Sequence, residues 1–387
     1  MTRAIGNLFP ELEKDLKAYT TGILPYQDIV ALIEGGRISA ESPIADEQIQ
    51  PASIDLRLGA TAWRVRASFL PGKSSVAAKI ARLKMHEIDL TRPAVLERGC
   101  VYIAEIMEAV KLPADIAGKA NPKSSTGRLD VFTRLITDGG AEFEDVAEGY
   151  RGKLYVEIVP RTFSVLLQQG TRLNQLRFVR GNPAPSDAKL DELDQELALV
   201  YSDSESPQPA IIKDGLRISV DLEGDTSGGI IGYRAKHHAP LIDLSKIGYY
   251  DTHEFWDPIT RNAAGNLVLN PDDFYILVSR ERIRIPSNFA ASMVPYDPSV
   301  GEFRIHYAGF FDPGFGYGAN DINGARAVLE VRSHEVPFLI EHGQDVGRLI
   351  YERLLSVPQK VYGLNIGSNY QSQGLKLSKQ FKAPIAG

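Results

Sequence analysis

The 387 residues include 43 lysines and arginines against 49 aspartates and glutamates, which gives a formal net charge of −6, and 43% of them are hydrophobic. A chain of this length suggests two domains, with enough apolar residues to bury real cores. The acidic balance argues against a surface for a nucleic-acid polymer, which would need a broad basic footprint. A small anionic ligand remains compatible with it, because a local cluster of arginine and lysine suffices.

The cellular compartment is indicated by cysteine usage and by the first residues. The single cysteine, Cys100, excludes an intrachain disulfide and fits a reducing cytoplasm. The first twenty residues contain acids and no continuous apolar run, so no signal peptide is expected. No apolar run along the chain is long enough for a membrane helix. We therefore expect a cytoplasmic protein without a membrane partner.

The predicted elements begin with a helix in "LPYQDIVALIEGGRIS", whose apolar positions share one face and which ends at Gly35 and Gly36. Short β-rich runs follow between turn residues, among them "SIDLRLG", "CVYIAEIM", "KLYVEIV" and "QLRFVRG". Many short strands at close spacing favour a sandwich or a barrel. Residues 181 to about 215 combine an acidic helix with Pro- and Ser-rich pieces, which is typical of an interdomain linker.

An internal repeat is the most informative feature of the sequence. "YIAEIMEAVKLPADIAGKANP" begins at Tyr102, and the similar "YILVSRERIRIPSNFAASMVP" begins at Tyr275. Glu157 and Glu330 have the same spacing as these two tyrosines, since 275 − 102 and 330 − 157 are equal. Such a register over a long stretch predicts a tandem duplication of one β domain.

The repeat also sets the predicted domain boundaries. "SIDL" at Ser53 resembles "SVDL" at Ser219, so the similarity extends toward the start of each copy. We predict a first domain in residues 1–200, which includes the N-terminal helices and ends with the acidic linker helix. A second domain in residues 201–387 ends with a polar C-terminal tail.

The repeated glutamates lie inside apolar strands. In "AVLEV", Val328 and Glu330 should point to one face of the strand, and Leu329 and Val331 to the other. A carboxylate in such a strand is unusual. It is either a satisfied buried or edge-strand acid, or a general acid/base with a raised pKa. Its presence in both copies favours a role, although shared ancestry would also explain it.

The residues present exclude some kinds of hydrolytic chemistry. A zinc deaminase needs His-x-Glu and Pro-Cys-x-x-Cys, whereas this chain has one cysteine and no His-x-Glu. There is no Walker A sequence and no Gly-x-Ser-x-Gly elbow. "NPKSSTGRLD", residues 121–130, could be a plain polar turn. It also suits a phosphate, because its small residues and serines offer donors while Lys123 and Arg128 add charge.

Two further segments allow a structural or a ligand-binding interpretation. "AGFFDPGFG", residues 308–316, is either a hairpin turn or a base pocket in which Asp312 or a backbone group contacts the base beside Phe315. The polar tail "YGLNIGSNYQSQGLKLSK", with Tyr362 and Gln373, is either a disordered end or a lid over a nucleotide.

Taken together, these motifs resemble those of the dCTP deaminases of the dUTPase-like superfamily. The matching pieces, in order, are "IEGGRIS", "IQPASIDLRLG", "KSSTGRLD", "AGFFDPGF", "VLE" at 328–330 and "NYQSQG". The resemblance implies a mainly β fold of two tandem dUTPase-like distorted β-barrel or jelly-roll domains with a few short helices. It implies a homo-oligomer with sites between domains or subunits. It also implies zinc-free hydrolysis of dCTP to dUTP and ammonia, with Mg²⁺ bound to the triphosphate.

The resemblance assigns roles to the residues that match its motifs. Ser124, Ser125 and Arg128 would bind phosphate or order the catalytic water and glutamate. Glu330 or Glu157 would move protons between water, the base and the leaving amine. The residues implied to bind the nucleotide are Lys123, Ser125, Ala308, Asp312, Phe315, Val328, Tyr362 and Gln373. No residue is implied as a protein ligand to a metal.

The family's motifs are divided between the two copies. The first copy has the Ser/Arg loop, but its hairpin "TDGGAEFEDVAEGYRG" lacks Asp-Pro-Gly; the second has that hairpin, but its loop "PYDPSVGEF" lacks Ser-Ser and Arg. We therefore hypothesise a composite site that combines Ser124 and Arg128 with Glu330 and Asp312. In a ring made of first copies alone, the loop would face Glu157 instead.

Two other functions remain open from the sequence. The first is a dUTP diphosphatase, or a bifunctional enzyme that performs both steps. A diphosphatase needs an aspartate near the α-phosphate and a Gly-rich aromatic tail, which "SQGLKLSK" fits poorly. The second is a non-catalytic nucleotide-binding regulator, which would bind dCTP without releasing ammonia. A purely structural tandem sandwich would leave the Ser/Arg loop and the repeated glutamates unexplained.

Overall fold

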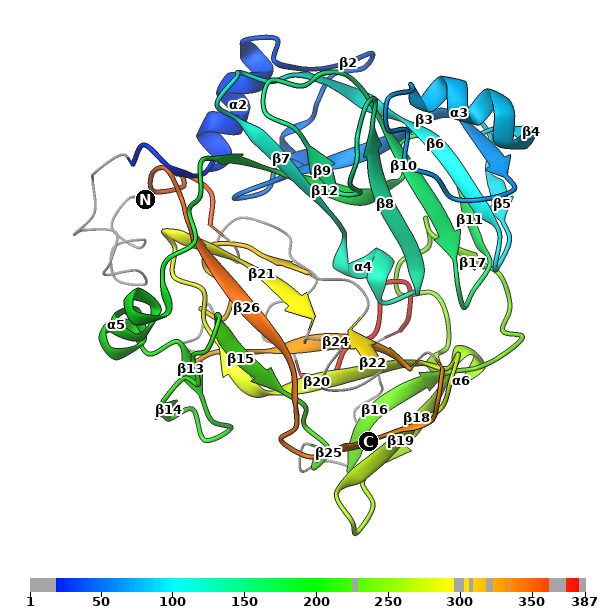
Figure 1. Cartoon of the computed structure of the whole chain (residues 1–387). Coiled ribbons are helices and arrows are strands. Elements are labelled where there is room, and N and C mark those ends of the chain that lie inside the picture. The colour runs from blue at the N-terminus through cyan, green and yellow to red at the C-terminus, as the bar shows by residue number, and fades with distance from the viewer. Residues whose placement is uncertain are drawn as a thin grey trace. The chain divides into compact units, whose positions relative to one another are not determined.

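A computed structural model describes residues 19–224, 229–295, 303–305, 309–317, 323–333, 335–361 and 374–382. They form two compact units. The first unit contains Thr21–Asn182, His237–Glu254 and a segment that begins at Ser378, and the second contains Pro183–Lys236 and Phe255–Leu377. Both units consist mainly of β-strands with a few short helices, which confirms the predicted fold class (Figure 1).

The first unit is built on one large sheet. Its strands are β1 (Gly22–Ile23), β2 (Ile38–Ala40), β3 (Ile54–Val65), β4 (Lys84–Asp89), β6 (Val101–Lys111), β7 (Ala117–Pro122), β8 (Val131–Thr137), β9 (Asp145–Val146), β10 (Arg151–Pro160) and β12 (Arg172–Arg180). They follow the order β8-β10-β6-β3-β12-β7-β9, with β1 paired to β12, β2 to β6 and β4 to β3. Because β7 and β8 also contact each other, the sheet curls toward a closed barrel (Figure 1).

The first unit also contains a small sheet and several short helices. The sheet has the order β17-β11-β5, from β5 (Ala94–Leu96), β11 (Val165–Leu167) and β17 (Ile242–Asp243). The helices are α2 (Tyr26–Glu34), a 3₁₀ turn at Asp46–Gln48, α3 (Val76–Leu83) and α4 (Ser124–Gly127), and α6 (Thr252–Phe255) leads back to the second unit. α2 is the helix predicted from the sequence. None of the described helices is both long and apolar enough to span a membrane.

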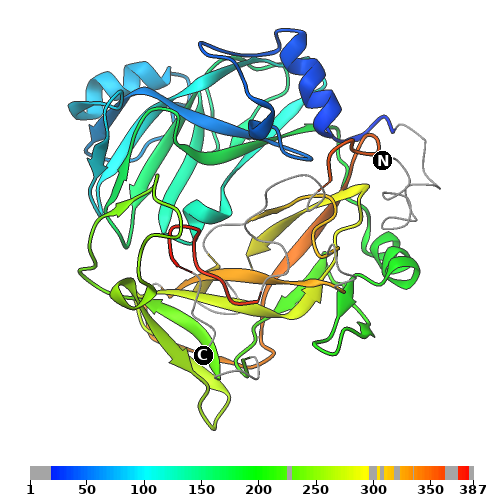
Figure 2. The same ribbon diagram turned by 180° about the vertical axis from the view of Figure 1, so that it is seen from behind.

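Helix α3 covers one face of the first unit's sheet (Figures 1 and 2). Ser75 caps its N-terminus, where its Oγ accepts a hydrogen bond from the Ala78 N–H at 3.2 Å. Val76 and Ile80, four residues apart, lie on the same side of the helix and are buried in a cluster with Ile103 of β6. The helix therefore shields this face of the sheet from water.

The described residues of the second unit form three sheets. Its strands are β13 (Val200–Tyr201), β14 (Pro207–Gln208), β15 (Leu216–Ser219), β16 (Ile230–Ala235), β18 (Trp256–Thr260), β19 (Asn266–Leu269), β20 (Phe274–Ile283), β21 (Phe289–Pro295), β22 (Phe303–Ile305), β23 (Phe310–Phe311), β24 (Ala325–Ser333), β25 (Phe338–Glu341) and β26 (Asp345–Arg353). One sheet has the order β14-β13-β20-β16-β18, with β24 paired to both β20 and β22. The other two are β15-β26-β21-β23 and β19-β25.

Strand register confirms the predicted duplication. In the first unit Glu157 of β10 pairs with Ile103 of β6. In the second unit Glu330 of β24 pairs with Ile276 of β20. The two pairs are separated by the spacing of the sequence repeat, since 330 − 157 and 276 − 103 are equal. The two ladders are therefore equivalent residue by residue.

The match between "SIDL" and "SVDL", by contrast, is not a structural equivalence. In register against the equivalent strands β12 and β26, Ile54 of β3 corresponds to Leu216 of β15. This register places Ser219 level with Arg57 and not with Ser53. Glu108 on β6 accepts the Arg57 N–H at 2.8 Å. Its counterpart on β20, Glu281, accepts the Ser219 N–H at 2.8 Å. The aspartates of the two motifs are therefore not counterparts.

The segment predicted as an interdomain linker belongs to the second unit. Helix α5 (Asp187–Leu197) places Leu190, only 2% exposed, in that unit's hydrophobic core. The Asp194 carboxylate accepts the Leu199 N–H at 2.8 Å and so ties the end of the helix to β13. The units therefore divide at residue 182 and not at residue 200, because the acidic helix has one apolar side that needs a core to cover it.

Candidate functional site

The Ser/Arg loop lies between β7 and β8 of the first unit. Ser124–Gly127 form the single turn of α4, in which the Arg128 N–H donates to the Ser124 carbonyl at 3.0 Å. Ser125 and Arg128 are both buried. The carbonyl of Ser125 accepts a 2.7 Å hydrogen bond from the Ser378 hydroxyl, on the segment that returns from the end of the chain. The loop is therefore an ordered and covered part of the unit, unlike a free surface turn.

A pocket of about 530 Å³ opens beside this loop and lies wholly within the first unit. Lys123 and Ser125 line it, as predicted for residues that contact a ligand. Asp55, Arg172 and Lys379 line it too, and the sequence analysis assigned no site role to them. Ser124 and Arg128 do not line this pocket. Its volume falls in the usual range for a small-molecule site.

The charges around the pocket favour an anion. Lys123 Nζ is bonded to the Asp55 carboxylate, and Arg172 Nη1 lies 3.8 Å from the other oxygen of that carboxylate. Burial, followed by the nearby charge of Lys123, lowers the pKa of Lys379. The second carboxylate of the pocket, Asp243, accepts two hydrogen bonds from Ser245. Three cationic side chains and two carboxylates leave an excess of positive charge, which suits a phosphate.

The duplication reverses one of these ion pairs. Arg217 and Asp345 occupy the positions of Asp55 and Arg172 in the second unit, and their side chains approach to 3.7 Å. Where the first unit has a carboxylate on β3 and a guanidinium on β12, the second therefore has the opposite arrangement. The pair was kept, but its charges are exchanged, so the two units do not present the same surface to an anion at these positions.

Glu157 of the first unit is buried and ion-paired to Arg134, whose side chain is 27% exposed. Arg134 stands directly opposite it on β8, with Nη2 at 2.6 Å and Nε at 3.0 Å from the same carboxylate oxygen. The guanidinium also donates to the Ser68 hydroxyl at 2.9 Å and lies over the Phe143 ring, 3.5 Å from its centre. Ile103, the other cross-strand neighbour of Glu157, packs beneath α3. α3 and its cluster therefore cover the Glu157 side of this face, while Arg134 stays partly exposed.

A second acid, Glu144, lies near this ion pair. The residue is half-buried, but its carboxyl is surrounded by protein and accepts the Leu135 N–H at 3.2 Å. Burial raises its pKa from 4.5 to about 8, against the opposing effects of the Leu135 hydrogen bond and the Arg134 charge. The carboxyl of Glu144 is therefore mostly protonated at neutral pH.

Glu330 of the second unit has different surroundings. Leu329 and Val331 point into the core, so Glu330 lies on the opposite face of β24, as the alternation predicts. Glu330 is 6% exposed, and Arg326 and Arg332 lie on its own face, four residues before it and two after it. On β20, Ile276 stands opposite Glu330 as Ile103 stands opposite Glu157. On the other side of β24 the described part of β22 ends at Ile305, which pairs with Val331.

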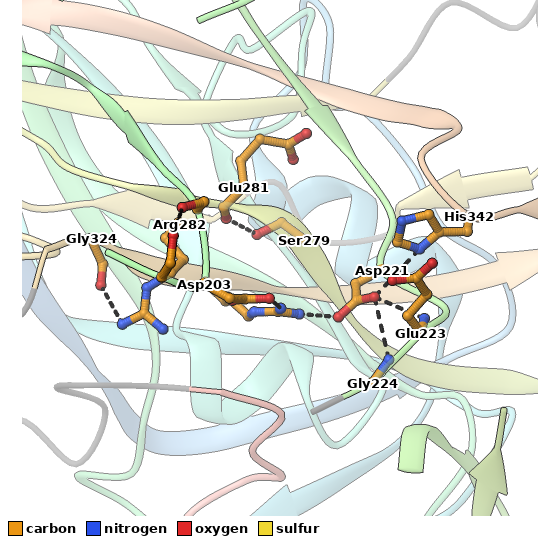
Figure 3. Close-up of polar contacts among 12 residues, drawn as sticks. Asp203, Asp221, Glu223, Gly224, Ser279, Glu281, Arg282, Gly324 and His342 are labelled. Carbon is orange, nitrogen blue, oxygen red and sulfur yellow. Dashed lines mark hydrogen bonds and ion pairs between the residues drawn. The ribbon is translucent and has the colours of Figure 1, made fainter. Parts of the chain in front are cut away.

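Arg326 anchors the strand that carries Glu330. It binds the Asp221 carboxylate and, through Nη2 at 2.6 Å, the Asp203 carboxylate (Figure 3). Burial is the largest single effect and would raise the Asp221 pKa, but the hydrogen bonds from Arg326 and from the Glu223 and Gly224 N–H groups, together with the Arg326 charge, lower it. On the other side of Asp221, His342 Nδ1 lies 3.4 Å from the carboxylate (Figure 3). The same nitrogen accepts the Leu222 N–H at 3.1 Å. The network is a structural support for β24.

The Asp-Pro-Gly segment forms a turn in the second unit, and β23 before it pairs with β21, so the described residues show no hairpin around it. The Asp312 carbonyl accepts the Phe315 N–H at 3.1 Å, and Phe315 packs edge-on against Phe311 with 5.0 Å between ring centres. Gly316 has φ of 80°, and a Cβ there would lie 2.1 Å from the Ile283 carbonyl oxygen, so the turn requires glycine. Val328 lies on β24, on the same face as Glu330. Three of the predicted residues, Ala308, Tyr362 and Gln373, fall outside the described residues, and so does the second copy's loop at 296–302.

Some of the residues that the sequence analysis did not assign to the site could be found from local sequence patterns, and others could not. Arg326 and Arg332 follow the same alternation as Glu330 in "RAVLEVRS", so the pattern contained them. Arg134 also alternates with apolar residues in "VFTRLIT". No local pattern indicates Lys379, because its position beside Lys123 depends on the path of the chain.

Comparison with known proteins identifies the family. Residues 20–182 match the model of the 2'-deoxycytidine 5'-triphosphate deaminase N-terminal domain, and residues 186–381 match that of the C-terminal domain. The chain belongs to the dCTP deaminase family.

Particular relatives show how the similarity is distributed. A crystal structure titled 2'-deoxycytidine 5'-triphosphate deaminase, from Agrobacterium tumefaciens, is 50% identical with a TM-score of 0.83, covering 87% of this chain and all of that one. A Nocardioides protein named "dCTP deaminase, dUMP-forming" is 31% identical over 159 residues, 41% of this chain and 80% of its own. A Thermobifida fusca protein of the same name is 32% identical over 164 residues, 42% of this chain and 80% of its own.

The raised pKa of Glu144 predicts a pH-dependent stability. Because the folded protein keeps this proton up to about pH 8 while the unfolded chain loses it near pH 4.5, the unfolding free energy should fall as pH rises between these values. Glu144→Gln should remove this loss, on the order of a few kcal/mol. Urea denaturation at a series of pH values measures it, with exposed Glu142→Gln as the control. Parallel curves for wild type and Glu144→Gln would show that the carboxyl is not buried as described.

Proposed function

We propose that the chain hydrolyses the C4 amine of dCTP to give dUTP and ammonia. The observation that carries the proposal is the cationic pocket built around the Ser/Arg loop, in a chain whose two halves both match the dCTP deaminase family. Lys123 and Ser125 line this pocket and would contact the phosphates. A nucleoside triphosphate supplies the anion that the charges of the pocket favour.

We further propose that the site is composite. The first copy would contribute Ser124 and Arg128, and the second copy would contribute Asp312 and Phe315 around the base. The other nucleotide contacts implied by the family's motifs are Ala308, Val328, Tyr362 and Gln373. Each copy has kept only its own part of this set, which supports a homo-oligomer whose sites lie between domains or subunits.

Glu330 is the proposed proton carrier, in preference to Glu157. A general base must take up and release a proton in every turnover. Two nitrogens of Arg134 donate to one oxygen of the Glu157 carboxylate, so a water would have to displace the guanidinium to reach that oxygen. In the first copy, α3 follows β3 and covers the face that holds Glu157. In the second copy the equivalent connection, which follows β16, is His237–Glu254, and this segment belongs to the first compact unit.

The proposed reaction follows from one carboxylate and one water. Glu330 takes a proton from the water as its oxygen attacks C4, and then transfers that proton to N3. The second proton of the water passes through the same carboxylate to the amine, which leaves as ammonia while the C4 carbonyl forms and N3 keeps its proton. Atoms balance as dCTP plus water giving dUTP plus ammonia.

Metal use is proposed from the donor groups. Mg²⁺ prefers oxygen ligands and is usually held by phosphates with one or two carboxylates, and Asp55 and Asp243 are the carboxylates that line the pocket. The ion would neutralise phosphate charge. For zinc, the sequence has a single cysteine, and no group of three or more His, Cys, Asp and Glu side chains converges among the residues that the structure describes. The chemistry is therefore assigned to protein acids and bases.

A second candidate is a bifunctional enzyme that continues from dUTP to dUMP and pyrophosphate. The names of the Nocardioides and Thermobifida relatives, which are called dUMP-forming, favour it. Those relatives match less than half of this chain, so their product does not transfer directly. A non-catalytic regulator would bind the nucleotide without ammonia release.

Separate substitution of the two glutamates by Gln distinguishes their roles. Glu330→Gln should lower kcat for ammonia release by about 10³-fold, because the proton carrier is lost. Glu157→Gln should leave kcat within a few-fold of wild type while lowering the thermal midpoint, since Arg134 loses its partner. The double variant Arg134→Gln, Glu157→Gln controls for the unpaired charge. The opposite pattern, with activity lost only in Glu157→Gln, would refute the assignment.

The products distinguish the candidate functions. Incubation of dCTP with the protein should release ammonia in equal amount to dUTP, with all three phosphorus signals of a nucleoside triphosphate retained in the ³¹P spectrum. Pyrophosphate and dUMP in place of dUTP would establish the bifunctional enzyme. Nucleotide binding without ammonia would establish the regulator.

Chelators test the proposed metal use. EDTA should raise the KM for dCTP, because the free triphosphate carries more charge into the pocket, and added Mg²⁺ should restore it. The zinc chelator 1,10-phenanthroline should leave kcat unchanged. Loss of activity with phenanthroline, restored by zinc, would contradict zinc-free chemistry.

A further inference from the structure

We propose that Lys379, near the end of the chain, is a binding residue for the triphosphate, brought into the first unit's pocket by the segment Ser378–Lys382. The inference deepens the proposed function and rests on it for the identity of the nucleotide. Lys379 lines the same pocket as Lys123, Ser125 and Arg172. It is the last residue of the predicted lid "YGLNIGSNYQSQGLKLSK", but no role was assigned to it and no family motif used above contains it.

The segment is fixed in place by its neighbours. Ser378 and Gln380, on either side of Lys379, are 2% and 3% exposed. The Ser378 hydroxyl donates to the Ser125 carbonyl of the Ser/Arg loop at 2.7 Å. The Gln380 carbonyl accepts the N–H groups of Tyr249 and Tyr250 at 2.9 and 3.1 Å. Lys379 therefore enters the pocket from a backbone that is held on both sides, which reduces the entropy lost when it binds a phosphate.

The charges in the pocket also favour a phosphate beside Lys379. Asp55 is already bonded to Lys123 and faces Arg172, so the carboxylate of this cluster is shared between two cations before Lys379 is counted. Burial and the charges of Lys123 and Arg172 lower the pKa of Lys379, with Asp55 opposing them. A bound polyphosphate would reverse this effect, because it adds negative charge among three cations.

The duplication limits the arrangement to one site per chain. The position equivalent to Arg172 carries Asp345 in the second unit, and the position equivalent to Asp55 carries Arg217. An aspartate in place of an arginine would repel a phosphate there. We therefore expect one triphosphate per chain, bound at the first copy.

Removal of the Lys379 charge tests the proposal. Lys379→Gln should raise the KM for dCTP roughly 10- to 50-fold with kcat within about two-fold, because a charge-assisted contact to bound substrate is lost. When binding is measured by calorimetry, the loss of affinity caused by Lys379→Gln should become smaller from dCTP to dCDP to dCMP. Lys379→Arg should restore most of the affinity, and wild type should bind one dCTP per chain. Lys382→Gln, in the same segment and exposed, is the matched control.

The outcomes separate this inference from the proposed function. An unchanged KM in Lys379→Gln, or an equal loss for dCTP and dCMP, would overturn the role of Lys379 while dCTP deamination stands. If wild type releases no ammonia, the proposed function fails, and titration with inorganic tripolyphosphate still decides: weaker binding in Lys379→Gln than in Lys382→Gln supports the phosphate site. Failure of wild type to bind either dCTP or tripolyphosphate would overturn it.

Discussion

A buried charge must be compensated, and this requirement decides what each half of the chain can do. The duplicated ladders place a glutamate at the same point of both sheets. In the first unit Arg134 stands opposite that glutamate and binds it, while α3 closes the face. In the second unit the arginines lie along the glutamate's own strand, and Arg326 is itself bound by Asp203 and Asp221. The two equivalent glutamates therefore have different charged neighbours.

The same requirement shapes the phosphate end of the site. The pair formed by Asp55 and Arg172 is reversed in the second unit as Arg217 and Asp345, so the contact across β3 and β12 survived duplication while its polarity did not. An ion pair tolerates such an exchange, because either orientation compensates both charges. A phosphate distinguishes the two orientations, since a cation at one position attracts it and a carboxylate in its place repels it. The reversal therefore costs the fold little and gives the two copies different charge arrangements at this point.

The sequence predicted more of the fold than of the site. The strands and the face on which Glu330 lies follow from alternation within a few residues, and the duplication follows from the similarity of the segments that begin at Tyr102 and Tyr275. The match of "SIDL" with "SVDL" was wrong in register, because side-chain identity over four positions is weaker than the hydrogen-bonded pairing of β3 and β15 with their neighbours. The acidic helix α5 resembled a linker in composition, yet Leu190 packs in a core. Of the pocket, Lys123 and Ser125 were predicted and Arg172 and Lys379 were not.

By itself the sequence determined the mainly β architecture, the tandem copies and the unequal division of the family's motifs between them, because alternation, turn chemistry and repeats are local properties of a chain. Only the tertiary structure decided that Glu157 is bound by Arg134, that the Asp55 pair is reversed in the second unit, and that Lys379 lies beside Lys123. Those facts depend on which strands are neighbours and where the last segment returns. Contacts between residues far apart in the chain leave no periodic trace, so the chemistry of each carboxylate and lysine became visible only once their surroundings were known.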